Sequence, residues 1–172
     1  VVDYVKSEKL NSLWRDHGWT YGKSDIKIDN KKELKVLFPE KEIADTFNKF
    51  SSHVLKLYSE ELSIPYFGLN RVRFNLYNPG MLMLPHDDHI YSIFKTGPED
   101  NTPKGIPVTS LIFALSDSNE YTGGEFEFSF MPEFKPVLNF GDVMLFPSAY
   151  PYRHCVKEVI TGKRYTGVVW AF

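Results

Sequence analysis

The densest cluster of metal-capable side chains in this sequence is Pro85-His86-Asp87-Asp88-His89. Side chains two positions apart on a β-strand share a face, so a strand here would point His86 and Asp88 to the same side. A third ligand must come from elsewhere. His154 is well placed, because it opens a later strand-like segment directly after a proline-bounded turn. Two histidines and one carboxylate, with open coordination positions, are typical of non-haem Fe(II) sites.

The ligand set alone leaves other interpretations open. A His-x-Asp pair occurs by chance in many chains and often makes only a hydrogen bond at the end of a strand. Zinc also binds two histidines and a carboxylate, with water as the fourth ligand. His17 and His53 fall in a predicted helical region and are expected to be surface or packing residues. Cys155 could supply a thiolate, but it would face away from His154 and fits a buried strand residue better.

Arg164 adds a second kind of chemistry to this pattern. It follows His154 by ten positions, across a hairpin turn predicted at Thr161-Gly162-Lys163. Such a hairpin would place the two residues on neighbouring strands inside one cavity. A buried cation is costly unless it is paired, and the nearby Glu158 would lie close to the turn, where water competes. A dicarboxylate ligand would supply the missing charge. The alternative is an exposed strand arginine.

Two helices and a series of strands are predicted to position these residues. Apolar residues in the region 40–62 recur every three or four positions, with Pro39 at the start and Pro65 after the end, which indicates an amphipathic helix with Ile43, Phe47 and Phe50 on its apolar face. A further helix is predicted over residues 3–17, ending at Gly18. The apolar face of the helix predicted over residues 40–62 also includes Val54, Leu57 and Tyr58.

After Pro65 the chain has the pattern of short strands separated by turns. This rhythm predicts a barrel or a two-sheet jelly roll, with the helices packed outside one sheet. Residues 95–107 are rich in glycine, proline and charge and are interpreted as a lid at the barrel mouth. The predicted strands are 71–77, 82–94, 108–115, 125–130, 135–139, 143–146, 154–160 and 164–172.

The composition fits one globular domain. Of the 172 residues, 42% are hydrophobic and 16% aromatic, which favours half-buried sheet surfaces. The net charge is −2 without a basic cluster, so no nucleic-acid partner is expected. No apolar run approaches the length of a membrane span, a single cysteine excludes an internal disulfide, and residues 1–4 lack the features of a signal peptide. A cytoplasmic location is therefore expected, and the oligomeric state is undetermined.

From Tyr77 to Trp170 the sequence resembles the prolyl 4-hydroxylase-like branch of the Fe(II)/2-oxoglutarate-dependent dioxygenases, especially small bacterial and viral hydroxylases. The matching residues occur in the family's order over slightly more than half of the chain, which is more specific than any single motif. They are Tyr77, Gly80, His86 and Asp88, then Tyr121 with Gly123-Gly124-Glu125-Phe126, then Phe140-Gly141-Asp142 and Phe146-Pro147-Ser148, and finally His154, Val156, Gly162, Arg164 and Trp170.

The resemblance implies a fold and a set of roles. The fold is a mainly β double-stranded β-helix (a jelly-roll or cupin-like barrel) over residues 65–172, with a helical N-terminal support over residues 1–64, in a single domain. The catalytic centre would be Fe(II) on His86, Asp88 and His154. Arg164 would bind the distal carboxylate of 2-oxoglutarate, with Tyr77 as a hydrogen-bonding partner. O2 would be the other co-substrate, and ascorbate is a candidate reductant.

Some positions depart from the family pattern. Met83 stands where the family often has a tyrosine, and residues 111–115 supply no hydroxyl, so the family's contacts at these places do not carry over directly. Trp170 is expected either to line the pocket or to belong to the core. In related halogenases the metal-binding carboxylate is absent, so an intact Asp88 favours hydroxylation.

The resemblance implies hydroxylation of an unactivated C–H bond, with succinate and CO2 as co-products. The expected substrate is a prolyl residue of a peptide or protein. A free amino acid or another small molecule is the alternative within the same chemistry. A non-catalytic cupin-like ligand-binding module is the alternative from another class, and the intact ligand set argues against it. A nucleic-acid demethylase is disfavoured by the absence of a basic surface.

Overall fold

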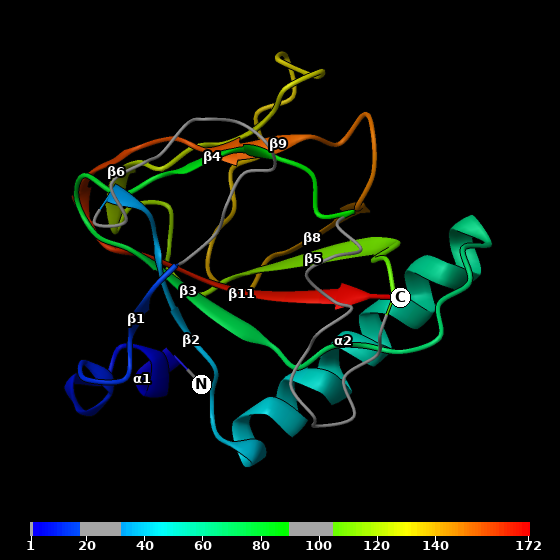
Figure 1. Cartoon of the computed structure of the whole chain (residues 1–172), viewed down its shortest axis with the longest axis horizontal. Helices are drawn as coiled ribbons and strands as arrows, with labels where there is room; N and C mark the ends of the chain where they lie inside the picture. The colour runs from blue at the N-terminus through cyan, green and yellow to red at the C-terminus, as the bar shows by residue number, and fades with distance from the viewer. Residues whose placement is uncertain (1, 18–31, 90–104) are drawn as a thin grey trace.

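The computed structural model describes residues 2–17, 32–89 and 105–172 (Figure 1). Its helices are α1 (Val2–Val5), the 3-10 helix η1 (Glu8–Leu10) and α2 (Lys41–Leu62). Its strands are β1 (Arg15–Asp16), β2 (Lys35–Leu37), β3 (Arg73–Tyr77), β4 (Met83–His86), β5 (Thr109–Ala114), β6 (Tyr121–Gly123), β7 (Phe126–Phe128), β8 (Val143–Pro147), β9 (His154–Val156), β10 (Val159–Gly162) and β11 (Arg164–Ala171).

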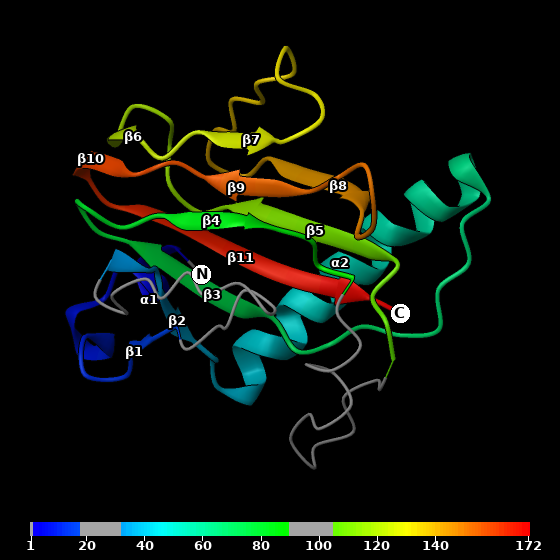
Figure 2. The same cartoon turned by 45° about the horizontal axis from the view of Figure 1, so that its top comes forward.

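The strands form a large sheet, a smaller sheet and a short two-stranded ribbon. The large sheet has the order β1-β2-β3-β11-β5-β8, the smaller sheet has the order β4-β9-β7, and the ribbon pairs β10 with β6. The strand pairs within these sheets are antiparallel. The smaller sheet lies over one face of the large sheet and α2 lies along the other face (Figures 1 and 2). The fold is therefore mainly β and jelly-roll-like.

Two hydrophobic cores hold these layers together, and β11 contributes to both. Its residues alternate, so that Tyr165 and Val169 join the core beneath α2 whereas Val168 and Trp170 join the core between the sheets. This two-sided burial explains why β11 is apolar along most of its length, as expected of a central strand. Every residue of β11 is buried.

The helix α2 confirms the prediction over residues 40–62, although its buried face is rotated from the one expected. The residues buried against the sheet are Ala44, Phe47, Ser51 and Leu55. Phe50 and Leu57, which were expected on the apolar face, are half exposed. Phe47 packs edge-on against Phe74 and Phe113, with ring centroids 5.1 and 5.4 Å away. A broad apolar stripe indicates a helix well, but the sheet surface decides which part of the stripe is covered.

The helix predicted over residues 3–17 is wrong. The chain forms only α1 and η1 there, and then enters β1, where Arg15 pairs with Val36 of β2. The Ser7 hydroxyl accepts a hydrogen bond from the Lys9 backbone N–H, which favours the short 3-10 turn over a longer helix. Pairing with β2 then overrides the local helical pattern. Gly18, the expected cap, lies outside the described residues.

Most predicted strands are present and most of them are shorter than predicted, although β8 extends one residue beyond its predicted end. Those over 71–77, 108–115, 125–130, 143–146 and 164–172 correspond to β3, β5, β7, β8 and β11. The strand predicted over 82–94 ends at His86, and the one over 154–160 divides into β9 and β10. Residues 135–139 form no strand, whereas β1, β2 and β6 were not predicted. The proposed lid falls almost wholly outside the described residues. None of the described helices has the length and apolar character needed to cross a membrane.

Candidate active site

The two candidate histidine ligands are brought together by the pairing of β4 with β9. His86 is the last residue of β4 and His154 the first residue of β9, and the antiparallel register places them directly opposite each other. Their ring centroids are 4.3 Å apart. Directly opposed residues on neighbouring strands have adjacent side chains, so this register alone joins two histidines that lie far apart along the chain.

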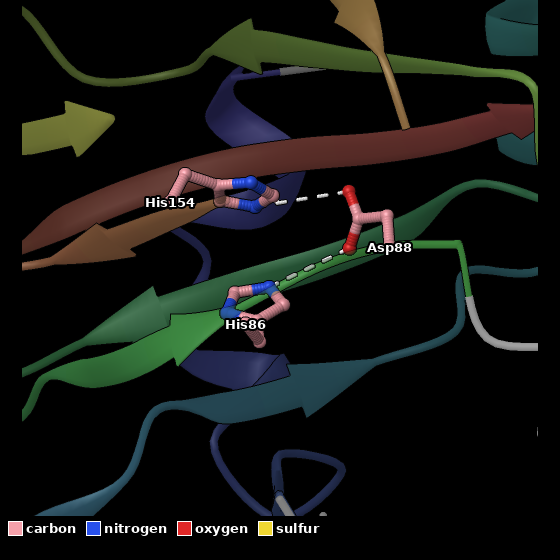
Figure 3. Close-up of side chains that lie close together, drawn as sticks. All are labelled: His86, Asp88 and His154. Carbon is pink, nitrogen blue, oxygen red and sulfur yellow. Dashed lines mark ion pairs between the residues drawn. The ribbon is translucent and has the colours of Figure 1, made fainter. Parts of the chain in front are cut away.

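Asp88 completes the cluster from just beyond the strand. Its Oδ1 lies 3.5 Å from Nε2 of His86, and its Oδ2 lies 3.7 Å from Nε2 of His154 (Figure 3). One ligand atom from each residue falls within 4.8 Å of the other two, as in a site that could hold a metal ion. The prediction that Asp88 shares a face with His86 holds, although Asp88 lies in a bend after β4 rather than within the strand.

Backbone carbonyls fix how the two imidazoles are presented. Nδ1 of His86 lies 2.8 Å from the Leu84 carbonyl oxygen, and Nδ1 of His154 lies 2.9 Å from the Tyr152 carbonyl oxygen. A carbonyl only accepts, so each Nδ1 carries the proton and each Nε2 keeps its lone pair. Each ring thereby turns its unprotonated nitrogen toward Asp88, which is the tautomer that a metal ligand requires.

Two serines support Asp88 from behind. The Ser110 hydroxyl donates to Oδ2 of Asp88 at 2.7 Å, and Oγ of Ser148 lies 2.8 Å from Oγ of Ser110. Both serines are buried, and such bonds hold a carboxylate in one orientation. Sequence reasoning did not identify Ser110. A polar residue within the apolar strand β5 was the only available signal.

The electrostatics of Asp88 and His154 suit a bound cation. Burial favours a protonated Asp88, but His154, His86 and the Ser110 hydrogen bond outweigh it and hold the pKa of Asp88 well below its ordinary value. Burial lowers the pKa of His154 to about 4, against the opposing attraction of Asp88. The site therefore offers one carboxylate and two imidazoles, a donor set that fits Fe(II) or zinc.

Arg164 lies in the same cavity as the three metal-capable residues, but the strand pairing that places it there differs from the prediction. The expected hairpin between the strands of His154 and Arg164 is wrong. β9 pairs with β4 and β7, whereas β11, which begins at Arg164, pairs with β3 and β5. Arg164 and His154 therefore lie on different sheets and both line the cavity between them. Between β9 in the smaller sheet and β11 in the large sheet, the chain forms β10, which pairs with β6 in the ribbon.

Arg164 is 4% exposed and packs against Tyr77, its register partner on β3. The guanidinium carbon lies 5.2 Å from the centre of the Tyr77 ring. Burial raises the pKa of Tyr77 despite the opposing effect of Arg164, so the phenol stays protonated and can donate a hydrogen bond. Trp170 lines this cavity and also packs in the core between the sheets. Glu158 is exposed, as expected of a residue near a turn.

The remaining candidate residues are accounted for elsewhere in the fold. His53 is exposed on α2, and Cys155 is a buried free thiol. His17 is a packing residue, as expected, but it is buried after β1 rather than placed on a helix. His89 is exposed and its Nδ1 lies 3.1 Å from the Pro107 carbonyl oxygen, so it does not join the cluster.

Comparison with protein families identifies the chain. The family model described as the 2OG-Fe(II) oxygenase superfamily matches residues 72–172, which is more than half of the sequence and includes every residue of the cavity cluster. The chain belongs to the 2OG-Fe(II) oxygenase superfamily. The protein is therefore an Fe(II)- and 2-oxoglutarate-dependent dioxygenase that uses O2. No curated protein matches the chain as a relative.

Solved structures of prolyl hydroxylases share the fold of this oxygenase. A viral collagen prolyl hydroxylase from Paramecium bursaria Chlorella virus 1, in complex with 2-oxoglutarate, has a TM-score of 0.63 and 18% identity, over 82% of this chain and 80% of that chain. A Pseudomonas putida prolyl-4-hydroxylase has a TM-score of 0.59 and 16% identity, over 80% and 71% of the two chains.

A third similar structure covers nearly the whole oxygenase. The prolyl hydroxylase from Trichoplax adhaerens, in complex with a peptide fragment of a hypoxia inducible factor oxygen degradation domain, has a TM-score of 0.64 and 14% identity. The match covers 99% of this chain and 74% of that chain. At these identities the likeness concerns the fold.

Proposed function

We propose that this dioxygenase hydroxylates an unactivated C–H bond of a prolyl residue in a peptide or protein, releasing succinate and CO2. The support is the prolyl hydroxylase character of the similar structures, one of which is a complex with a peptide fragment. Ascorbate would serve as the reductant that keeps iron in the ferrous state.

The observation that carries this proposal is the convergence of His86, Asp88, His154 and Arg164 on one cavity. The first three would hold Fe(II): His86 and His154 come from the paired strands β4 and β9, and Asp88 follows β4. The bound iron would supply O2 activation coupled to decarboxylation of 2-oxoglutarate. The protein would supply neutral nitrogen donors, one oriented carboxylate and a cavity shielded from water.

Arg164 would hold the distal carboxylate of 2-oxoglutarate, and the phenol of Tyr77 would donate to the same group. A guanidinium binds a carboxylate through two parallel hydrogen bonds, which fixes its direction as well as its position. Arg164 is already ordered by its packing on Tyr77, so little side-chain freedom is lost on binding. Apolar neighbours in the cavity, among them Ile112 and Val168, would keep water from competing.

The architecture proposed around this site is one domain. Residues 65–172 would close into a double-stranded β-helix barrel with the site between its two sheets. Residues 1–64 would support the barrel, since α2 packs on the outer face of the large sheet and β2 extends that sheet beside β3.

Anaerobic addition of Fe(II) and 2-oxoglutarate tests the proposed function directly. The complex is expected to show a weak visible charge-transfer band, and air is expected to start succinate formation. A proline-containing peptide should increase the succinate yield and gain one oxygen atom by mass spectrometry. If the folded protein gives neither the band nor succinate, the proposed function is wrong. If succinate forms but no peptide in a panel of proline-containing peptides is oxidised, only the assignment of a prolyl substrate is contradicted.

Gly124 tests the anchoring role of Arg164 from a neighbouring position. A Cβ on Gly124 would lie 2.9 Å from Cγ2 of Val159 and 3.2 Å from Cδ of Arg164, at a φ of +68°. The change Gly124→Ala is expected to push the arginine stem aside and to weaken 2-oxoglutarate binding about tenfold, because a charged hydrogen bond is misaligned. Titration of the charge-transfer band with 2-oxoglutarate measures this effect.

Gly80→Ala is the matched control for this change. Gly80 has a similar φ of +85°, but a Cβ there would meet nothing within 4 Å. Both variants therefore carry the backbone strain of a left-handed alanine, and only Gly124→Ala crowds Arg164. Equal affinity losses in the two variants would assign the effect to backbone strain and contradict the positioning role of Gly124.

A further inference from the structure

A second buried arginine lines the cavity. Arg73 opens β3 and is 6% exposed. It shares its strand face with Tyr77, because the two residues are four positions apart, and it lines the cavity together with His86, Asp88 and His154. Arg73 lies outside the motif residues that match the family, which begin at Tyr77.

The surroundings of Arg73 orient its guanidinium. Its Nε donates to Oδ1 of Asn75 at 3.0 Å, and the guanidinium carbon lies 4.8 Å from the centre of the Trp170 ring. Its Nη1 lies 3.4 Å from Nε2 of His17, whose Nδ1 lies 3.3 Å from Oε2 of Glu33. His17 and Glu33 precede the family-matched residues 72–172, so the N-terminal segment reaches the site through this chain of contacts.

Arg73 lies toward the opposite end of the cavity from the anchor proposed for 2-oxoglutarate. Tyr77 pairs with Arg164, whereas Arg73 pairs with Val168, four residues or about 13 Å further along the strands. Asp88 is bonded to Ser110, whose register partner on β11 is Trp170. The metal-capable cluster therefore lies nearer the Arg73 end, where the substrate must bring its C–H bond.

We propose that Arg73 is a specificity-determining residue that binds a carboxylate of the substrate close to the carbon that is hydroxylated. This inference rests on the hydroxylation proposed above and adds a carboxylate to the features of its substrate, whether that substrate is a peptide or a free amino acid. A guanidinium packed over the Trp170 ring in a buried cavity suits a planar carboxylate, which it binds more specifically than a lysine would. The carboxylate has three possible sources: the C-terminus of a peptide, an acidic side chain beside the proline, or a free amino acid.

Matched pairs of probes test this assignment on protein loaded with Mn(II) and 2-oxoglutarate, which binds substrate without turnover. Calorimetry compares acetyl-glycyl-proline with its C-terminal amide, acetyl-prolyl-glutamate amide with acetyl-prolyl-glutamine amide, and free proline with prolinamide. At least one carboxylate probe is expected to bind about tenfold more tightly than its amide partner, the scale of a charged hydrogen bond. The pair that shows the preference identifies the source of the carboxylate.

Variants then connect that preference to Arg73. Arg73→Gln is expected to remove the preference, and Arg73→Lys to keep part of it. Arg153→Gln is the matched control, because Arg153 is partly exposed and bonded to Asp87 and to the Pro85 carbonyl oxygen. The control is expected to keep the preference in full. Wild-type protein that binds carboxylate and amide probes equally would overturn the assignment, as would a preference that survives Arg73→Gln.

The failure of this inference is distinguishable from that of the proposed function. A wild-type protein that forms the charge-transfer band and succinate but shows no carboxylate preference would contradict only the role of Arg73. A wild-type protein without the band would contradict the proposed function itself. If Arg73→Gln does not fold, the wild-type preference and its partial retention in Arg73→Lys still decide the assignment.

Discussion

Replacing His154 by alanine is expected to abolish tight Fe(II) binding and, with it, succinate formation. The change removes one of three donors from a cluster whose ligand atoms lie within 4.8 Å of one another. Loss of an outer-shell partner of a metal ligand typically costs 10–100-fold in affinity, so loss of a ligand itself is expected to cost more than about 100-fold. Iron titration under anaerobic conditions, followed by succinate assay in air, measures both effects.

The matched control for this change is His89→Ala. His89 lies three positions after His86, but its ring contacts the Pro107 carbonyl and does not face the cluster. Iron binding is expected to stay at the wild-type level in this variant. If His154→Ala keeps tight iron binding and His89→Ala loses it, the third ligand is His89 and not His154. The folding of both variants is checked by thermal unfolding, because His154 is a buried side chain.

Removing the guanidinium of Arg164 is expected to weaken 2-oxoglutarate binding by about 1.5–3 kcal/mol, the range for hydrogen bonds to charged groups, which corresponds to roughly 10–150-fold. Arg164→Met is preferable to Arg164→Ala for this measurement, because it keeps much of the stem that packs beside Gly124 and Tyr77. Titration of 2-oxoglutarate into the Fe(II) protein without O2 gives the affinity. Iron binding in the absence of 2-oxoglutarate is expected to be little changed.

Two further variants separate charge from geometry at this position. Arg164→Lys keeps the positive charge but loses the planar fork, so it is expected to bind 2-oxoglutarate with intermediate affinity. Arg153→Met removes an arginine outside the cavity and is expected to have no effect. Unchanged affinity in Arg164→Met would show that another residue anchors the distal carboxylate. Arg73 would then be the next candidate, because it is the other arginine that lines the cavity among the described residues.

Local sequence patterns were enough to predict the candidate ligands and the mainly β character of the chain. His86 and Asp88 were recognisable because a spacing of two is short enough for local backbone geometry to place both side chains together. The helix α2 was recognisable because twenty-two residues of periodic apolar pattern outweigh the competing local preferences. These features depend on contacts between residues close in the chain, and such contacts leave a pattern in the sequence.

The way in which distant segments of the chain meet could not be predicted from local patterns. A local hairpin was expected to join His154 to Arg164, but the chain passes through the β6–β10 ribbon and puts the two residues on facing sheets. Three placements depend on the same choice of strand partners: Ser110 behind Asp88, Arg73 four register positions from Arg164, and His17, which follows β1, beside Arg73. Strand pairing is set by the burial of whole sheet faces, and a single strand's sequence specifies its buried face but not its partner.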